Sequence, residues 1–258
     1  MPIAALMSLS PGDDVNFFTI SRACEPSCAS VPSMRSPREA RCAFTLIELL
    51  VVIAIIAILI GLLFPAFKGV QNQAKQTQAK NDLTQIVNAV NAYYTEYGRY
   101  PVDVPASNTS DAYFGSGTAP SGTVSYGSND WLFDVLRNNT SSTKTASNAC
   151  TAGTNLVTCL NPRQIVYINP PYVKDPAHPR SGIGTPAGTG PGQFFGPWGN
   201  AHSIVIDENY NNQMTNPYTA DTGAGPATLR QGVIAWSAGA DGTQGTNYSN
   251  SDDVISWQ

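Results

Sequence analysis

The sequence predicts an α+β fold, in which one long N-terminal helix packs on a small antiparallel β-sheet with long polar loops and an acidic C-terminal loop. An apolar run at residues 44–67 continues into an amphipathic repeat that reaches Tyr97, which indicates a single long helix. Two segments rich in β-branched residues, 202–207 and 232–237, lie between turn-rich stretches and predict strands. Packing such a sheet on the second half of the helix buries the apolar faces of both.

Composition argues against several classes of function. The 258 residues are 42% hydrophobic and only 12% charged, and the formal net charge is −4, so no broad basic surface for nucleic acid is expected. The sequence contains no Gly-x-Ser-x-Gly, His-Glu-x-x-His or phosphate-binding glycine-rich motif. Its two histidines are His178, in a proline-rich loop, and His202, at the start of a predicted strand; neither setting is typical of a general base. The chain is therefore not predicted to be an enzyme.

The apolar run at residues 44–67 is long enough to cross a membrane. As a helix its 24 residues span about 36 Å, at ~1.5 Å per residue, against a hydrocarbon core of about 30 Å. Glu48 lies inside this run, and an ionised side chain costs on the order of 2.5 to 3.5 kcal/mol at the bilayer centre, and less near an end. Because burying this charge in a membrane is costly, we expect Glu48 to have a specific function.

Beyond this run the helix becomes amphipathic. Apolar residues recur at three- and four-residue steps, at Leu83, Ile86, Val87, Val90, Tyr93, Tyr94 and Tyr97. The whole helix would be on the order of 80 Å long, so one half must project while the other packs on a domain. Pro65 lacks an amide hydrogen and crowds the carbonyl of Gly61, which predicts a bend or local melting there. Gly98 and Pro101 predict the end of the helix.

A basic segment that ends in Arg41-Cys42-Ala43 precedes Phe44-Thr45-Leu46-Ile47-Glu48. This arrangement resembles the class III signal of type IV pilins and of the pseudopilins of type II secretion systems. The resemblance implies that prepilin peptidase cuts between Ala43 and Phe44 and that Phe44 is then N-methylated. The family nearly always has glycine where this chain has Ala43, and its helix has a proline at the position of Pro65.

The resemblance gives the charge of Glu48 a role, because this residue becomes the fifth of the mature chain. In a filament its carboxylate would pair with the Phe44 amine of a neighbouring subunit in a low-dielectric core, which sets the register of the stack. A signal anchor with an incidental acidic residue is the alternative. The matching residues on both sides of Glu48 disfavour that alternative.

The domain organisation follows from the implied cut. Residues 1–43 are expected to form a removed leader, 44–67 the transmembrane and filament-core half of the helix, 68–97 its amphipathic half, and 98–258 a periplasmic globular domain. We expect translation to start at Met34, which gives a short basic leader of the kind typical of the family. Lysines and arginines flank both ends of the apolar run equally, so the orientation rests on the resemblance.

Polar tracts interrupt the predicted globular domain. Stretches rich in Ser, Thr, Gly and Asn at 102–129 and 138–155 flank a short apolar segment, 131–136, which is predicted to be helical. Residues 164–168 predict a strand or extended segment, and a Pro- and Gly-rich connection covers 169–197. We interpret the tracts as surface loops without a specific role.

The five cysteines divide at the implied cut. Cys24, Cys28 and Cys42 precede it, whereas Cys150 and Cys159 follow it and would reach an oxidising periplasm. Because these two are the only cysteines of the mature chain, they are predicted to form a disulfide.

The acidic tail, residues 237–257, resembles the end of major pseudopilins, where a loop holds one calcium ion through two aspartates and backbone carbonyls. Carried over, the resemblance gives Asp241 and Asp253 the carboxylate roles and the carbonyl of Ala238 a backbone role, with Asp252 as a close substitute. Calcium prefers six to eight oxygen ligands, which a glycine-rich acidic loop supplies. An acidic turn without metal is the alternative.

These features favour a structural subunit of a type II secretion pseudopilus, anchored by one span in a bacterial inner membrane. The phrase Trp198-Gly199-Asn200 and the acidic tail also resemble pseudopilins. Implied partners are further copies of the chain, prepilin peptidase, an inner-membrane assembly platform and minor pseudopilins. A type IV pilin of a surface pilus is the nearer alternative, and a membrane-anchored periplasmic enzyme or adhesin is the alternative of another class.

Overall fold

The computed structural model describes residues 44–105, 107–148, 150–184 and 192–258, apart from the side chains of residues 65 and 66. The predicted leader, the start at Met34 and the cleavage residue Ala43 lie outside the described residues. The chain divides into two units, residues 1–52 and 53–258, and the boundary falls within the long N-terminal helix.

Helix α1 (Leu46–Tyr97) is 52 residues long, which corresponds to about 78 Å at ~1.5 Å per residue. Its backbone is helical without interruption through Gly61 and Pro65, so the helix does not melt there. The predicted bend at these residues stays a prediction. After Tyr97, Gly98 adopts φ +66° and its amide donates to the Tyr94 carbonyl at 2.8 Å, which ends the helix where the sequence predicted.

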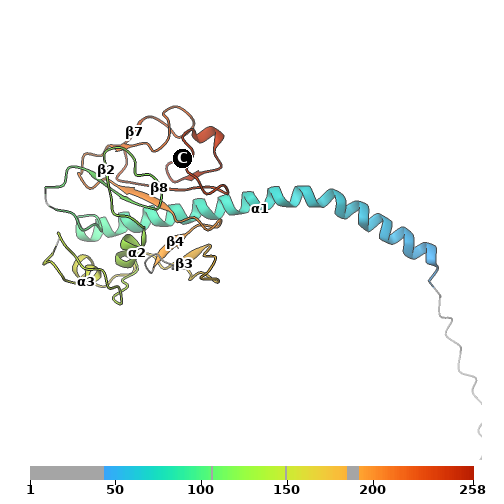
Figure 1. Cartoon of the computed structure of the whole chain (residues 1–258), viewed down its shortest axis with the longest axis horizontal. Helices are drawn as coiled ribbons and strands as arrows, with labels where there is room; N and C mark the ends of the chain where they lie inside the picture. The colour runs from blue at the N-terminus through green and yellow to red at the C-terminus, as the bar shows by residue number, and fades with distance from the viewer. Residues whose placement is uncertain (1–43, 106, 149, 185–191) are drawn as a thin grey trace, which may run out of the picture. The chain divides into compact units, whose positions relative to one another are not determined.

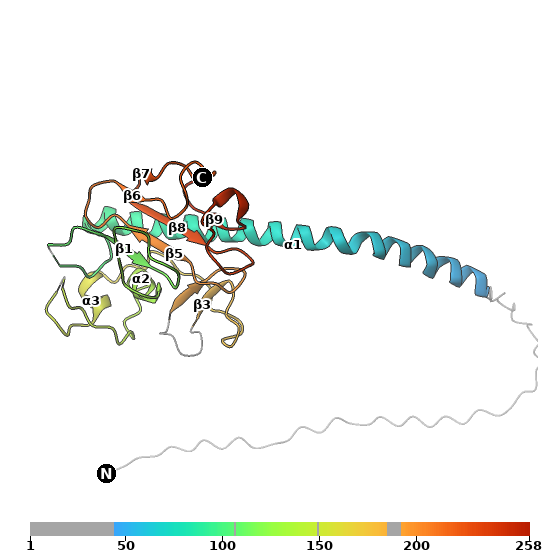
Figure 2. The same ribbon diagram turned by 45° about the horizontal axis from the view of Figure 1, so that its top comes forward.

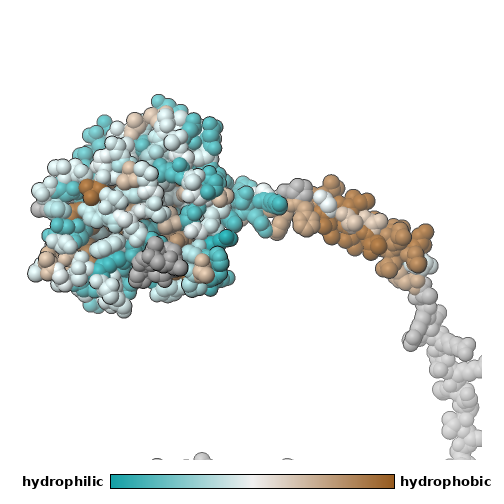
Figure 3. Space-filling model, viewed as in Figure 1, coloured by the Kyte–Doolittle hydropathy of each residue, from teal (hydrophilic) through white to brown (hydrophobic). Residues whose placement is uncertain are grey.

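The two halves of α1 differ in burial. The described side chains from Leu46 to Phe64 are all exposed, and on the face drawn in Figure 3 apolar side chains cover this part of the helix. In the second half one face is buried, at Ala79, Leu83, Ile86, Ala89, Val90 and Tyr93. The amphipathic repeat is thereby confirmed, although Tyr94 remains 39% exposed. α1 is the one helix among the described residues that is long and apolar enough to cross a membrane.

A five-stranded sheet packs on the second half of α1 (Figures 1 and 2). Its spatial order is β2-β1-β5-β8-β9, and the strands are β1 (Asp111–Phe114), β2 (Thr123–Ser125), β5 (Ser203–Ile206), β8 (Val233–Ser237) and β9 (Val254–Ile255). All pairings are antiparallel except that of β1 with β2, which is parallel. The α+β class is confirmed, and the sheet is mixed at one edge.

Alternating side chains of the sheet enter two separate cores. On the α1 side, Ala112, Ile204 and Ala235 join the buried helix face together with helix α2 (Asp130–Leu136) and helix α3 (Leu156–Leu160). On the opposite side, Tyr113 and Trp236 pack against the hairpin of β6 (Met214–Thr215) and β7 (Thr228–Leu229). Because both faces are covered, β1, β5 and β8 are buried along their whole length.

The two predicted strands and the short predicted helix are confirmed as β5, β8 and α2. The expected loops hold further structure: β1 and β2 in 102–129, β3 (Gly182–Gly184) and β4 (Gln193–Phe195) in 169–197, and a 3₁₀ turn, η1 (Tyr248–Asn250), in the tail. Residues 164–168 pair with no strand, and the Tyr167 amide donates to the Leu136 carbonyl instead. The strand prediction is therefore wrong there, and Gln164 adopts φ +55°, outside the extended region.

Candidate functional site

The start of α1 is organised by Thr45 and Glu48. The Glu48 carboxylate accepts from the Thr45 amide at 2.8 Å and from the Thr45 hydroxyl at 2.7 Å, and the Glu48 amide donates to that hydroxyl at 3.3 Å. This reciprocal pattern is a capping box, in which two amides that the helix leaves unpaired find acceptors. Phe44, immediately before it, is 76% exposed.

The capping box is a function of Glu48 that our interpretation of the sequence missed. The spacing Thr-x-x-Glu before an apolar run is a known sequence signal for a helix start, so the pattern was readable. Within one chain, the carboxylate of Glu48 therefore already has partners. A second partner, such as an amine, would have to share or displace them.

In the acidic tail, Asp253 is a buried acceptor, only 6% exposed. Its carboxylate accepts from the Tyr218 hydroxyl at 3.0 Å, from the Gly245 amide at 2.9 Å and from the Gly239 amide at 3.2 Å. Burial, together with the charge of Asp253, raises the pKa of the Tyr218 phenol, so the hydroxyl stays a donor. Asp253 thus ties three separate segments of the chain together.

Asp252 occupies a different position in the same loop. Its Oδ2 accepts from the amides of Ala240 at 2.5 Å and Asp241 at 3.3 Å, whereas its buried Oδ1 has no hydrogen-bond partner among the described residues. Asp241 accepts from the Thr243 amide at 2.8 Å. The close approach of Asp252 leaves no room for a side chain at Gly239, where an added Cβ would lie 2.2 Å from its carboxyl carbon.

The predicted calcium ligands fit a cation unequally. Among the described residues, no three His, Cys, Asp or Glu side chains are grouped to hold a metal. The Ala238 carbonyl already accepts from the Asn200 amide at 3.2 Å, and both oxygens of Asp253 accept from protein donors. The unpartnered Oδ1 of Asp252 is the oxygen that fits best, because a buried acceptor without a donor is costly unless something binds it.

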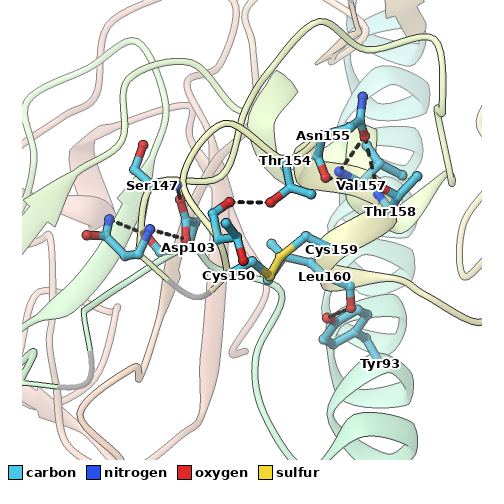
Figure 4. The surroundings of a disulfide bond; sticks show 12 residues. Tyr93, Asp103, Ser147, Cys150, Thr154, Asn155, Val157, Thr158, Cys159 and Leu160 are labelled. Carbon is cyan, nitrogen blue, oxygen red and sulfur yellow. Dashed lines mark hydrogen bonds between the residues drawn. A yellow bond between two sulfur atoms is a disulfide. The ribbon is translucent and has the colours of Figure 1, made fainter.

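Cys150 and Cys159 are joined by a disulfide, with their Cα atoms 6.2 Å apart (Figure 4). The bridge links the end of a polar loop to α3, where the Asn155 side chain caps the helix by accepting from the amides of Val157 and Thr158. Next to the bridge, the Tyr93 hydroxyl of α1 donates to the Leu160 carbonyl at 2.5 Å (Figure 4). The disulfide therefore holds the loop against the buried face of the long helix.

The two histidines lie in contrasting settings. His178 is exposed and its Nδ1 is 3.2 Å from Asp175. His202 is fully buried, packs its ring edge-to-face on Phe194, and has its Nε2 3.9 Å from Asp82 of α1. Burial lowers the pKa of His202 to about 3 and raises that of Asp82 to about 6, so at neutral pH the imidazole is neutral and packs as part of the core.

Residues 39–64 match the family model of the prokaryotic N-terminal methylation motif. No curated protein and no solved structure matches the chain. The matched segment includes Phe44 and Glu48 and ends within the exposed half of α1. The match supports a type IV pilin-like N-terminus, and the apolar part of α1 that follows is long enough to cross a membrane.

Proposed function

We propose that the chain is a structural subunit of a type II secretion pseudopilus, assembled by the packing of α1 helices after removal of residues 1–43 and N-methylation of Phe44. The observation that carries the proposal is the methylation motif at residues 39–64, followed by an apolar helix half that the chain itself leaves uncovered. Lipid covers such a surface before assembly, and helices of other copies cover it afterwards.

Glu48 supplies specificity to this assembly. A carboxylate buried among packed helices is costly unless it is paired, and the new amine at Phe44 of a neighbouring copy is a suitable partner. In the single chain the amide and hydroxyl of Thr45 donate to the carboxylate, so the subunit in the membrane holds this charge hydrogen-bonded although it has no oppositely charged partner. In this proposal, assembly adds an ion pair to the cap that already exists.

The proposal places the chain once across the inner membrane, with residues 98–258 in the periplasm. Its partners are prepilin peptidase, an inner-membrane assembly platform, minor pseudopilins and other copies of the chain. The disulfide between Cys150 and Cys159 suits an oxidising compartment. A type IV pilin in a surface pilus would use the same helix, and the resemblance of the acidic tail to pseudopilins favours the first candidate.

Mass spectrometry of the membrane form tests the maturation. In a host with prepilin peptidase, the mature chain should begin with N-methylphenylalanine at residue 44 and Thr45. An intact leader in that host contradicts the proposal. Electron microscopy of cells that overproduce the chain then separates short periplasmic rods, which the pseudopilus predicts, from long surface fibres, which a pilus predicts; a mature chain that forms neither would favour an anchored adhesin or enzyme.

We further propose that the tail binds one calcium ion through Asp252 and Asp241, with nearby carbonyl oxygens such as that of Ala238 completing the shell. Asp253 contributes by holding the loop in place. A bound cation would give the buried Oδ1 of Asp252 a partner and offset the repulsion between the aspartates.

Calcium is therefore expected to stabilise the detergent-solubilised chain. With free calcium at about a hundred times its dissociation constant, the free energy of unfolding should rise by near 2.7 kcal/mol, read as a higher melting temperature than in excess chelator. Asp252→Asn should remove this difference. Asp175→Asn, at an exposed aspartate elsewhere, should keep it. Equal melting of the unmodified chain in calcium and chelator would show that the tail is an acidic turn only.

A further inference from the structure

A cavity of about 500 Å³ opens where the chain leaves α1 and meets the turn that follows β5. Its polar and aromatic lining comes from Arg99, Tyr100, Asn108, Asn148, Glu208, Asn209 and Tyr210. Its size lies within the range of small-ligand sites. None of the sequence motifs and none of the assembly features described above involve this cavity.

Glu208 is the unusual member of this lining, since one oxygen of its buried side chain has no hydrogen-bond partner among the described residues. The residue is 8% exposed, and this oxygen is its Oε2. Burial is the main cause that raises the pKa of Glu208 to about 8; the charge of Asp207 acts in the same direction and that of Arg99 opposes it. A cation placed in the cavity would reverse this effect and favour the carboxylate.

The three asparagine side chains of the cavity have amide donors in use. The side-chain amide of Asn108 donates to the Ser110 carbonyl at 2.6 Å, and that of Asn148 donates to the Asp103 carbonyl at 3.2 Å. The amide of Asn209 donates to Asp111 at 2.8 Å. The Oδ1 atoms of Asn108 and Asn209 each accept one backbone amide, at 3.3 and 3.1 Å, and a carbonyl oxygen can accept a second donor from a ligand. Arg99 is the one side chain of the lining with a permanent positive charge.

Tyr210 adds an aromatic face beside the carboxyl. Its ring stacks on that of Tyr100, with centroids 5.5 Å apart, and yet the residue remains 50% exposed. A ring face attracts a cation, and the attraction grows when water is excluded. A buried carboxyl, amide oxygens and an exposed tyrosine are together complementary to a group that is positively charged and rich in N–H donors.

We propose that this cavity binds an organic cation, a guanidinium or primary ammonium group, through the carboxylate of Glu208 and the ring of Tyr210. The group can belong to a free amine or to an arginine or lysine side chain of another protein. Binding does not require filament assembly, so the site is independent of the proposed function.

Isothermal titration of the detergent-solubilised full chain with agmatine, and separately with the peptide acetyl-Gly-Arg-Gly-amide, tests the proposal. Either probe is expected to bind at millimolar or lower concentration, and tighter binding of the peptide identifies a side chain as the natural ligand. Glu208→Gln should weaken binding at least tenfold, and Tyr210→Ala severalfold. Tyr172→Ala, at another exposed tyrosine, should leave binding unchanged.

Arg99 separates the proposal from its main competitor, in which Arg99 itself pairs with Glu208 in solution. If the cavity takes an external cation, Arg99→Gln should tighten binding of both probes, because a repelling charge is removed. If Arg99 is the partner, the unmodified chain binds neither probe, and Arg99→Gln lowers the melting temperature. That result, or equal binding by Glu208→Gln and the unmodified chain, overturns the proposal.

Discussion

Replacing Glu48 with glutamine is expected to abolish filaments while the amount of protein in the membrane stays normal. Glutamine keeps the shape of the side chain and can still accept from Thr45, so the capping box survives. It carries no charge, however, and the Phe44 amine of a neighbouring subunit would be left unpaired among packed helices, at a cost of about 3 to 5 kcal/mol per contact. Electron microscopy and quantitative blotting of membranes measure the two outcomes.

Two further variants separate the cap from the charge. Thr45→Ala removes the capping hydroxyl, costs about 0.5 to 2 kcal/mol at the helix start, and should leave filaments in place. Glu48→Ala loses both contributions and should resemble the glutamine variant in filament number. Abundant filaments from Glu48→Gln would refute the charge pairing, and loss of filaments from Thr45→Ala alone would assign the role to the cap.

Asp253→Ala is expected to cause a large loss of stability in the globular part of the chain. The substitution leaves the Tyr218 hydroxyl and the amides of Gly239 and Gly245 without their acceptor inside the protein. Hydrogen bonds to a charged acceptor contribute about 1.5 to 3 kcal/mol each, and their effects overlap, so the free energy of unfolding should fall by on the order of 3 kcal/mol or more. Urea unfolding followed by tryptophan fluorescence measures this, since Trp236 lies in the adjoining core.

The loss should appear in chelator as well as in calcium, because the three bonds need no metal. Asp253→Asn keeps one acceptor oxygen and should lose less than the alanine variant. Asp175→Ala, at an exposed carboxylate, is the control and should change stability by less than about 0.5 kcal/mol. A loss for Asp253→Ala that appears only in calcium would instead make Asp253 a direct ligand.

Elements with a strong local pattern could be predicted from the sequence. The repeat from Leu83 to Tyr93 set the buried face of α1, and the β-branched runs at 202–207 and 232–237 became β5 and β8. The missed strands are only two to four residues long, too short for an alternating pattern to stand out, and some of them depend on distant partners. β1, for example, pairs with β5, which lies about ninety residues later in the chain. No sequence pattern within 102–129 predicts this pairing.

The candidate sites divide in the same way. The residues around Phe44 and Glu48 are contiguous, so the motif could be recognised from the sequence. The capping-box spacing was also present there, although our interpretation missed it. The partners of the tail were not readable, because Tyr218 and Asn200 reach Asp253 and Ala238 from segments far away in sequence. Glu208 also gave no signal, since only its burial in the folded chain makes its carboxyl unusual.

The short edge strands of the sheet have a consequence for unwanted aggregation. β2 has three residues and β9 has two, so each outer edge offers few free backbone groups to a foreign strand. A filament would bring many identical sheets together at high local concentration, a condition that promotes edge-to-edge pairing and amyloid-like stacking. With such short edges, strand exchange between neighbouring copies is disfavoured. Strand pairing would thus not compete with the proposed association through the helix.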